Sequence, residues 1–169
     1  MRPTISSMRS VLRSISSCGN PYEITHEKIL NSGKQLFLKN GYERTNLREL
    51  CKEAGVTTGA FYRHFADKSA IFTELVDEAA GELLSKFDIA EDECFDYLDK
   101  GNTDEVWKIS SEAVIEFIEY TYMHFDAFKL ILCCSDGTKY SDYIDRLVER
   151  DLKSTYRMFE VLEIGRAHV

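Results

Sequence analysis

Residues 47–65 of the chain read LRELCKEAGVTTGAFYRHF, two short helical patterns separated by a single glycine. The first pattern places four apolar residues on one face: Leu47, Leu50, Cys51 and Ala54. Either Thr45 or Asn46 can cap its start. Thr57 offers a capping hydroxyl to a third helix, which we expect to run to Phe65. Gly55 stands between the two patterns, where a tight turn needs a positive φ, so the stretch predicts a helix-turn-helix.

Polar residues on the outward side of the third helix add weight to this interpretation, because one glycine between two helices is a weak signal by itself. They are Thr57, Thr58, Gly59, Tyr62, Arg63 and His64. Such side chains can donate to phosphates or base edges. Gly59 costs a helix up to ~1 kcal/mol relative to Ala, which suits a backbone that approaches a duplex closely. Tyr62 or His64 alone would more often be a packing or surface residue, and it is their joint spacing that favours DNA binding.

The flanking residues continue the helical pattern on both sides. An earlier helix is predicted from Thr25 to Asn40-Gly41, and its apolar face is Ile29, Leu30, Gly33, Leu36 and Phe37. Asp67 can cap a fourth helix, whose apolar face is Ile71, Phe72, Leu75, Ala79 and Leu83. We therefore expect an all-α chain, with a three-helix DNA-binding domain at residues 23–72 followed by a helical regulatory domain at residues 73–162.

This stretch resembles the DNA-binding domain of the tetracycline-repressor (TetR) family over about fifty residues, with the spacing of the family pattern intact. The matching residues are Ile29-Leu30, Leu36-Phe37, Gly41-Tyr42, Thr45, Ala54-Gly55-Val56-Thr57, Gly59, Phe61-Tyr62-Arg63-His64-Phe65 and Lys68. One departure is Ser32-Gly33, where the family usually has two alanines. We expect this departure to loosen the first helix slightly without touching the DNA face.

The resemblance implies a role for each residue of the candidate DNA-binding site. The residues expected to meet phosphates at helix N-termini are Thr45 or Asn46, and Thr57. Those expected to face the major groove are Thr58, Gly59, Ala60, Tyr62 and Arg63. Arg48 would reach a base edge or a nearby phosphate, Tyr62 and His64 would also hold phosphates, and Lys68 would clamp one. Arg63 is the candidate for bidentate contact with guanine, worth ~1–3 kcal/mol of discrimination.

The distribution of charge permits DNA binding at the front of the chain, although the formal net charge of the 169 residues is −8. Residues 1–22 hold three arginines and no acidic residue, and residues 23–72 hold eight Lys or Arg and six Asp or Glu. Residues 73–169 hold ten basic and 23 acidic residues. Phosphate binding needs local positive charge rather than a basic whole chain, and the acidic second half would repel DNA and help to orient the approach.

Residues 1–22 are rich in serine and lack periodicity, and we expect a disordered basic extension that Pro21 closes. A basic arm that touches DNA is the alternative interpretation, and Met8 offers an alternative start. The segment lacks the apolar centre and cleavage site of a secretory signal. No apolar stretch in the chain reaches the ~18–20 residues that cross a bilayer. The five scattered cysteines form no disulfide framework, so the sequence predicts a cytoplasmic protein without membrane contact.

Residues 73–162 remain helical in pattern and acidic. The resemblance implies that this half carries a small-molecule pocket and that its last helices form a homodimer interface. An aromatic-rich stretch could line the pocket for an unidentified effector: Phe117, Tyr120, Tyr122, Met123, Phe125 and Phe128. Ordinary core packing is the stronger alternative for each of these residues.

Catalytic and metal-binding patterns are absent from the sequence. The adjacent pair Cys133-Cys134 would make a strained disulfide and a poor chelate, and we expect both residues to pack within a helix. The acidic run between Asp88 and Asp99 lacks the alternating oxygens and central glycine of a calcium loop. We find neither a phosphate-cradling loop nor a nucleophile–base pair, and therefore expect no enzyme, cofactor or metal.

Residues 163–169 read EIGRAHV and are expected to break the helical pattern. The seven residues match the translation of a common sequencing-adapter read-through, and we interpret them as an artefactual tail on a truncated chain. A truncated chain would lack part of the dimer interface that the resemblance implies.

The sequence thus predicts a repressor that binds a near-palindromic operator in double-stranded DNA as a homodimer and is released by a small-molecule effector. Two alternatives stay open. One is a helical interaction module or small enzyme with an incidental helix-turn-helix, and the other is an activator or a DNA-binding protein without an effector.

Overall fold

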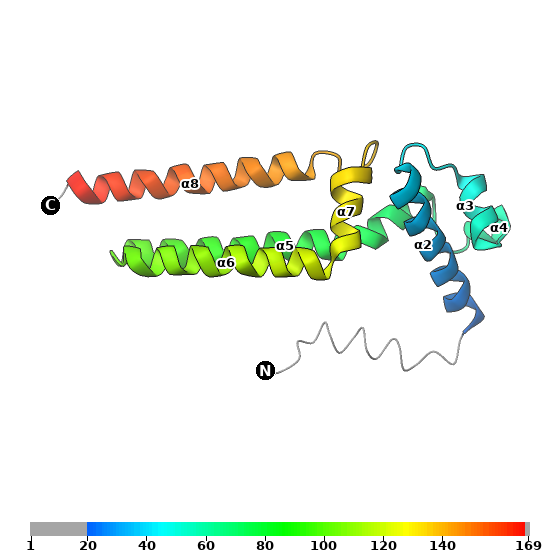
Figure 1. The fold of residues 1–169 in the computed structure, drawn as a ribbon, viewed down its shortest axis with the longest axis horizontal. Coiled ribbons are helices and arrows are strands. Elements are labelled where there is room, and N and C mark those ends of the chain that lie inside the picture. The colour runs from blue at the N-terminus through cyan, green and yellow to red at the C-terminus, as the bar shows by residue number, and fades with distance from the viewer. Residues whose placement is uncertain (1–19, 168–169) are drawn as a thin grey trace.

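The computed structural model describes residues 20–167, and the side chains of residues 20–162. This part of the chain contains seven helices and no strand, so the predicted all-α fold is confirmed. The helices are α2 (Pro21–Asn40), α3 (Leu47–Ala54), α4 (Thr58–Phe61), α5 (Lys68–Asp99), α6 (Thr103–Met123), α7 (Phe125–Cys134) and α8 (Tyr143–Ala167). Figure 1 shows α2, α3 and α4, here called the head, at one end of the long helix α5, and α6, α7 and α8, here called the rear half, along the rest of it.

Helix α2 begins four residues before the predicted start at Thr25. Asn20 is its N-cap and accepts a hydrogen bond from the Tyr22 amide at 3.1 Å, while Pro21 occupies the first helical position. Proline fits there because its φ is already helical and the first turn has no use for its missing N–H. Pro21 therefore opens a helix rather than closing an extension, and the rest of that predicted extension, residues 1–19, lies outside the described residues.

The caps around the turn follow the sequence closely. The Asn46 side chain accepts from the Glu49 amide at 2.8 Å, and the Thr57 hydroxyl accepts from the Ala60 amide at 3.1 Å. Gly55 adopts a left-handed conformation with φ 66° and ψ 32°, which ends α3 and turns the chain into α4. The predicted helix-turn-helix is therefore present, with Asn46 as the cap of α3.

Helix α4 is shorter than the predicted span from Thr57 to Phe65. It holds only Thr58–Phe61, and residues 62–64 continue as turns. The amides of Arg63 and His64 bond to the carbonyls of Ala60 and Phe61, three residues back, as in a 3₁₀ turn. The exposed side of this segment thus includes both a short helix and the turn that follows it.

Helix α5 crosses the predicted domain boundary at residues 72 and 73 without a break, and its N-cap Asp67 is confirmed by a 2.8 Å bond from the Ala70 amide. One hydrophobic core extends from the head across this helix into the rear half. Its members include Ile29, Phe37, Leu50, Phe61, Phe72, Val76, Ile131 and Tyr143. The head and the near end of the rear half therefore share a core, and no linker separates them.

The rear half is less well covered. Helices α5 and α6 lie side by side and α7 crosses at their inner end (Figure 1). Two apolar stripes remain exposed, namely Trp107, Val114, Ile118 and Tyr122 on α6, and Ile144, Val148, Leu152 and Tyr156 on α8. Helix α8 continues to Ala167, so the expected break of the helical pattern after residue 162 is wrong. None of the helices in residues 20–167 has the length and apolarity needed to cross a membrane.

Candidate nucleic-acid interface

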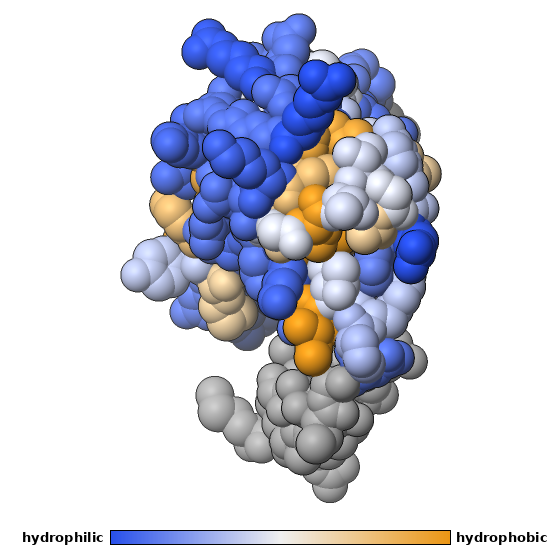
Figure 2. Space-filling view, turned by 90° about the vertical axis from the view of Figure 1, so that its right-hand side faces the viewer, coloured by the Kyte–Doolittle hydropathy of each residue, from blue (hydrophilic) through white to orange (hydrophobic). Residues whose placement is uncertain are grey.

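The α4 segment divides its residues between two sides. Phe61 and Phe65 are buried in the core, with 0% and 3% exposure. The opposite side is open, and it presents Thr57, Thr58, Gly59, Tyr62 and Arg63, with Ala60 partly covered. Because the two phenylalanines anchor the segment, Tyr62 and Arg63 between them point away from the protein. Figure 2 faces this end of the molecule and shows hydrophilic side chains over its upper and left part, beside a central area of intermediate and hydrophobic residues.

Gly59 lies in an open position on this surface. A Cβ added there would have nothing within 4 Å. The glycine is therefore not required by packing inside the protein. A close approach of DNA to the backbone remains the predicted reason for a glycine at this position.

The head presents further exposed polar and basic residues beside the α4 segment. Asn46 and Arg48 are both exposed at the start of α3, as the candidate site requires. Arg44, in the loop before α3, is exposed as well and was not among the predicted contacts. Its position outside both helical patterns is the reason that helix periodicity does not identify it.

Thr45 does not belong to this surface. Its side chain is 1% exposed, and its hydroxyl donates to the Gly41 carbonyl at 2.8 Å, with the Leu36 carbonyl at 3.4 Å. The hydroxyl is thus used inside the head and cannot reach a phosphate. Of the two cap candidates, Asn46 is the one that caps α3, and its contact with a phosphate stays a prediction.

Lys68 is also engaged inside the protein. Its ammonium group donates to the carbonyls of Tyr42 at 2.8 Å, Glu43 at 3.3 Å and Thr45 at 2.8 Å, and lies 4.2 Å from the centroid of the Tyr42 ring. An ammonium has three N–H donors, so none remains for a phosphate in this conformation. Partial burial lowers the pKa of Lys68, and the nearby Glu43 carboxylate opposes that shift. Lys68 fastens the loop before α3 to the start of α5, which corrects the expectation of a phosphate clamp.

His64 is half-buried and contacts the first turns of α2. Its ring centroid lies 4.2 Å from that of Tyr22 and 5.8 Å from that of His26. Its Nδ1 is buried without a hydrogen-bond partner. Desolvation, together with the neighbouring His26 and Arg63, lowers the pKa of His64 and favours the neutral ring. Tyr22 and His26 precede Ile29, the first residue that matches the family pattern, so the sequence did not place them at the site.

The six candidate pocket residues do not line one cavity. Tyr120 and Phe128 are buried in the main core, and Phe117 stacks on Phe87 at 5.7 Å. Tyr122 is 79% exposed and lines neither of the two clefts described here. Met123 and Phe125 line a cleft of about 380 Å³ where α2, α5 and α7 meet. Neither of the two clefts brings the six residues together, and the aromatic effector pocket stays a prediction.

This cleft joins the head to the rear half. Its lining is Lys34, Leu75, Met123, His124, Phe125, Asp126, Ala127 and Leu130. Lys34 of α2 forms an ion pair with Asp126 of α7 at 2.5 Å. A second, smaller cleft of about 230 Å³ lies between α5 and α6, beside Phe117.

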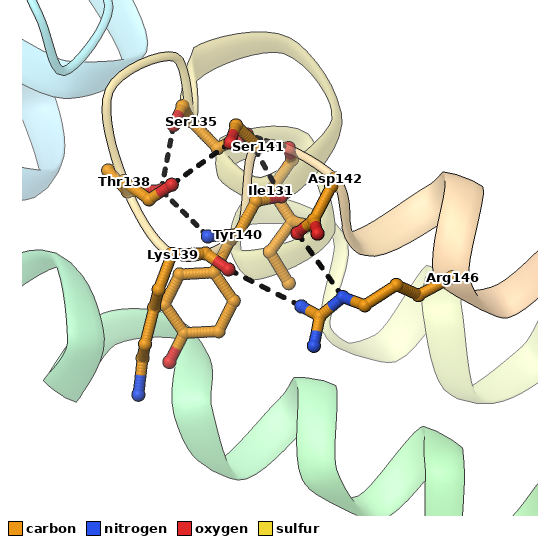
Figure 3. Close-up of polar contacts among 8 residues, drawn as sticks. All are labelled: Ile131, Ser135, Thr138, Lys139, Tyr140, Ser141, Asp142 and Arg146. Carbon is orange, nitrogen blue, oxygen red and sulfur yellow. Dashed lines mark hydrogen bonds and ion pairs between the residues drawn. The ribbon is translucent and has the colours of Figure 1, made fainter.

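The loop between α7 and α8 provides a second junction. The Tyr42 amide in the head donates to the Cys134 carbonyl at 3.0 Å. The Thr138 hydroxyl donates to the Ser135 carbonyl and accepts from the Tyr140 amide, which shapes the loop shown in Figure 3. The Tyr140 hydroxyl then donates to Asp77 of α5 at 2.5 Å, and this bond is the main cause of a lowered Asp77 pKa. Head, α5 and α8 are thus joined through one short loop.

The cysteines and acidic residues do not assemble a site in the described part of the chain. Cys134 is buried, as packing within a helix requires, while Cys133 is exposed. Desolvation raises the pKa of the Cys134 thiol, which keeps it protonated. Residues 20–167 contain no group of three side chains placed to hold a metal ion.

Comparison with known proteins agrees with this geometry. Residues 29–75 match the family model described as bacterial regulatory proteins, tetR family. The HTH-type transcriptional regulator AcrR of Shigella flexneri is 47% identical over 51 residues, which cover 30% of this chain and 24% of that protein. The HTH-type transcriptional repressor BepR of Brucella suis is 44% identical over 55 residues, or 32% of this chain and 26% of that protein.

A solved structure extends the likeness beyond the head. A transcriptional regulator of the TetR/AcrR type from Aquifex aeolicus superposes with a TM-score of 0.53 and 26% identity, over 80% of this chain and 74% of that one. The AcrR and BepR matches, in contrast, span only about a quarter of the lengths of those two proteins. Residues 29–75, which the family model matches, contain the turn at Gly55 and the exposed side of the α4 segment.

Proposed function

We propose that this chain, which belongs to the TetR family of bacterial regulators, controls transcription by binding DNA through the exposed side of α3 and the α4 segment. The observation that carries the proposal is the pair of buried anchors, Phe61 and Phe65, that direct Tyr62 and Arg63 outward. An arginine in such a position can bond two acceptors on the major-groove edge of guanine.

The proposed contact set follows from exposure and hydrogen bonding. It contains Asn46, Arg48, Thr57, Thr58, Gly59, Ala60, Tyr62 and Arg63, with His64 at its edge. Thr45 and Lys68 are left out because their polar groups are used inside the head. Arg44 is added as an exposed cation near the start of α3.

Repression by a dimer is the finer part of the proposal. Two copies would place their α4 segments in successive major grooves, about 34 Å apart, on a near-palindromic operator. The name of the BepR relative supports repression rather than activation. The uneven charge of the chain supports an approach to DNA with the head in front.

An effector would act at a junction between head and rear half. The cleft lined by Met123 and Phe125 is the site we favour, because a ligand there would contact α2 and α7 together. Such a ligand can shift the head relative to the rear half only if it binds the DNA-binding arrangement and the released arrangement with different affinities. The Lys34–Asp126 pair across the cleft would then be separated or strengthened.

Selection of bound sequences from a random DNA library, followed by titration, tests the central claim. Arg63→Ala should weaken binding to the selected operator by about 5- to 150-fold while affecting random DNA much less. Tyr62→Ala should also weaken operator binding. Lys108→Ala is the matched control, because Lys108 is exposed on α6, away from the head and outside the last helices that would form the dimer interface. A wild-type chain that selects no sequence at low salt would overturn the proposal.

A further inference from the structure

We infer that Tyr22, in the first turn of α2, positions Arg63 for its contact with DNA. The inference rests on the proposed function, since it assigns Tyr22 a part in DNA recognition only through Arg63. Tyr22 precedes the residues that match the family model, which begin at Ile29. It also lies 41 positions before Arg63 in the sequence.

Tyr22 contacts the end of the α4 segment with both of its functional parts. Its hydroxyl donates a hydrogen bond to the backbone carbonyl of Arg63 at 3.3 Å. Its ring covers the His64 ring at a centroid distance of 4.2 Å. The Tyr22 side chain thus contacts two successive residues: Arg63, the arginine proposed to contact guanine, and its neighbour His64.

The α4 segment needs such support because its regular helix ends at Phe61. Arg63 and His64 are held from within the segment only by bonds three residues back, whose geometry is poorer than that of an α-helix. A bond from another helix therefore removes a larger share of their freedom. A backbone segment that is fixed before binding loses less entropy when its residues contact DNA.

His26 provides a second contact, one turn further along α2. Its ring stacks on Phe65 at 4.4 Å, and its Nε2 lies 2.8 Å from a carboxylate oxygen of Glu74 on α5. The start of α2 is therefore fastened to α5 as well as to the α4 segment. Tyr22 consequently sits on a fixed support rather than on a free helix end.

Tyr22→Phe is the variant that tests the role, because it removes the hydroxyl bond to Arg63 and keeps the ring against His64. Tyr156→Phe is the matched control, the same change at a tyrosine that is 67% exposed on α8. We expect Tyr22→Phe to weaken binding to the selected operator by about two- to tenfold, the range for loss of one hydrogen bond. Binding to random DNA and the thermal midpoint should stay at the values of the control.

A double-mutant cycle separates positioning from a general structural effect. In an Arg63→Ala background, Tyr22→Phe should have no further effect on operator affinity, because the residue through which it acts is gone. An equal loss in both backgrounds, or an equal loss on random DNA, would overturn the inference.

Hydrogen exchange in the free protein tests the same contact without DNA. Tyr22→Phe should speed exchange of the Arg63 and His64 amides relative to Tyr156→Phe. Unchanged exchange at these two amides would overturn the positioning role. If the wild type selects no DNA sequence while this exchange effect is present, the proposed function fails and the contact between Tyr22 and the α4 segment stands.

Discussion

His64 lies where the end of the α4 segment meets α2, and its surroundings disfavour a charge. The groups that face it are Tyr22 and His26 from α2 and its own neighbour Arg63, while Glu74 of α5 is reached only through His26. Desolvation, the His26 ring and the Arg63 guanidinium lower its pKa below the ordinary value of 6.5. The folded head therefore favours neutral His64.

The stability of the protein should fall as the pH drops below about 6.5, the pKa of an unperturbed histidine. Between that value and the lower pKa in the fold, the unfolded chain binds the proton more readily, so the free energy of unfolding decreases as the pH falls. Below the folded pKa the loss is complete. His64→Gln should lose less stability than the wild type between pH 7.5 and 5.5, as measured by urea unfolding.

His124→Gln serves as the control for this comparison, because His124 is exposed at the junction of α6 and α7. The His26–Glu74 pair is present in all three proteins. Equal pH dependence in the wild type and His64→Gln would show that His64 does not contribute.

Thr45 and Lys68 show where prediction from sequence stops at this scale. Thr45 and Asn46 are both short polar residues before a helix, and the sequence cannot tell which one turns inward. Packing decides, because Thr45 bonds the carbonyl that ends the preceding helix. Lys68 is a flexible cation near a predicted helix start, and only the fold brings three backbone carbonyls within its reach.

At the scale of elements, Gly33 sets how closely α2 approaches α5. A Cβ added at Gly33 would lie 2.7 Å from Cγ2 of Ile71, which is fully buried. The Cγ2 methyl sits next to the backbone and cannot swing away as the end of a long side chain can. The departure from the family's alanine pair therefore permits a close crossing of two helices, rather than only loosening the first helix.

Gly33→Ala should destabilise the protein despite the better helix propensity of alanine. The propensity gain is up to ~1 kcal/mol, while overpacking costs ~1–3 kcal/mol, so we expect a lower free energy of unfolding in urea. Gly81→Ala is the matched control, because Gly81 lies in helix α5 with nothing within 4 Å of an added Cβ. The control should be stabilised by up to ~1 kcal/mol. A Gly33→Ala protein as stable as this control would contradict the close crossing.

The predicted secondary structure was most accurate where a single residue and its near neighbours determine the local backbone conformation. The turn at Gly55 and the caps at Thr57 and Asp67 follow from backbone and hydrogen-bond chemistry that a short stretch contains. The length of α4 was predicted less well. The apolar spacing of Phe61 and Phe65 favoured a helix to residue 65, whereas the regular helix ends at Phe61. Periodicity within one helix says little about the candidate pocket, because its residues are divided between α6 and α7 and range from the buried Phe128 to the exposed Tyr122.

At the scale of the whole molecule, the described chain has two hydrophobic cores, and the boundary between them does not coincide with the predicted domain boundary at residues 72 and 73. The main core includes α2, α3, the first half of α5 and the inner ends of α7 and α8. A second cluster, Cys94, Leu98 and Val106, lies at the far end of α5 and α6, with Met158 and Val161 of α8 against it. The weak point of the molecule should therefore lie between these cores, and not at residues 72 and 73.

Native-state hydrogen exchange should reveal this division. Residues 29–38 of α2 and 72–83 of α5 are packed in one core, so their slowest amides should open together, with a shared free energy close to that of global unfolding. Residues 94–110 depend on the smaller cluster beside exposed stripes of α6 and α8, and should open at a lower free energy. The exchange rates of both groups, followed against urea by NMR, measure the two openings. An α2 that opens well before residues 72–83 would instead place the division at the predicted boundary, and would mean that the head can move without disturbing the core it shares with α5.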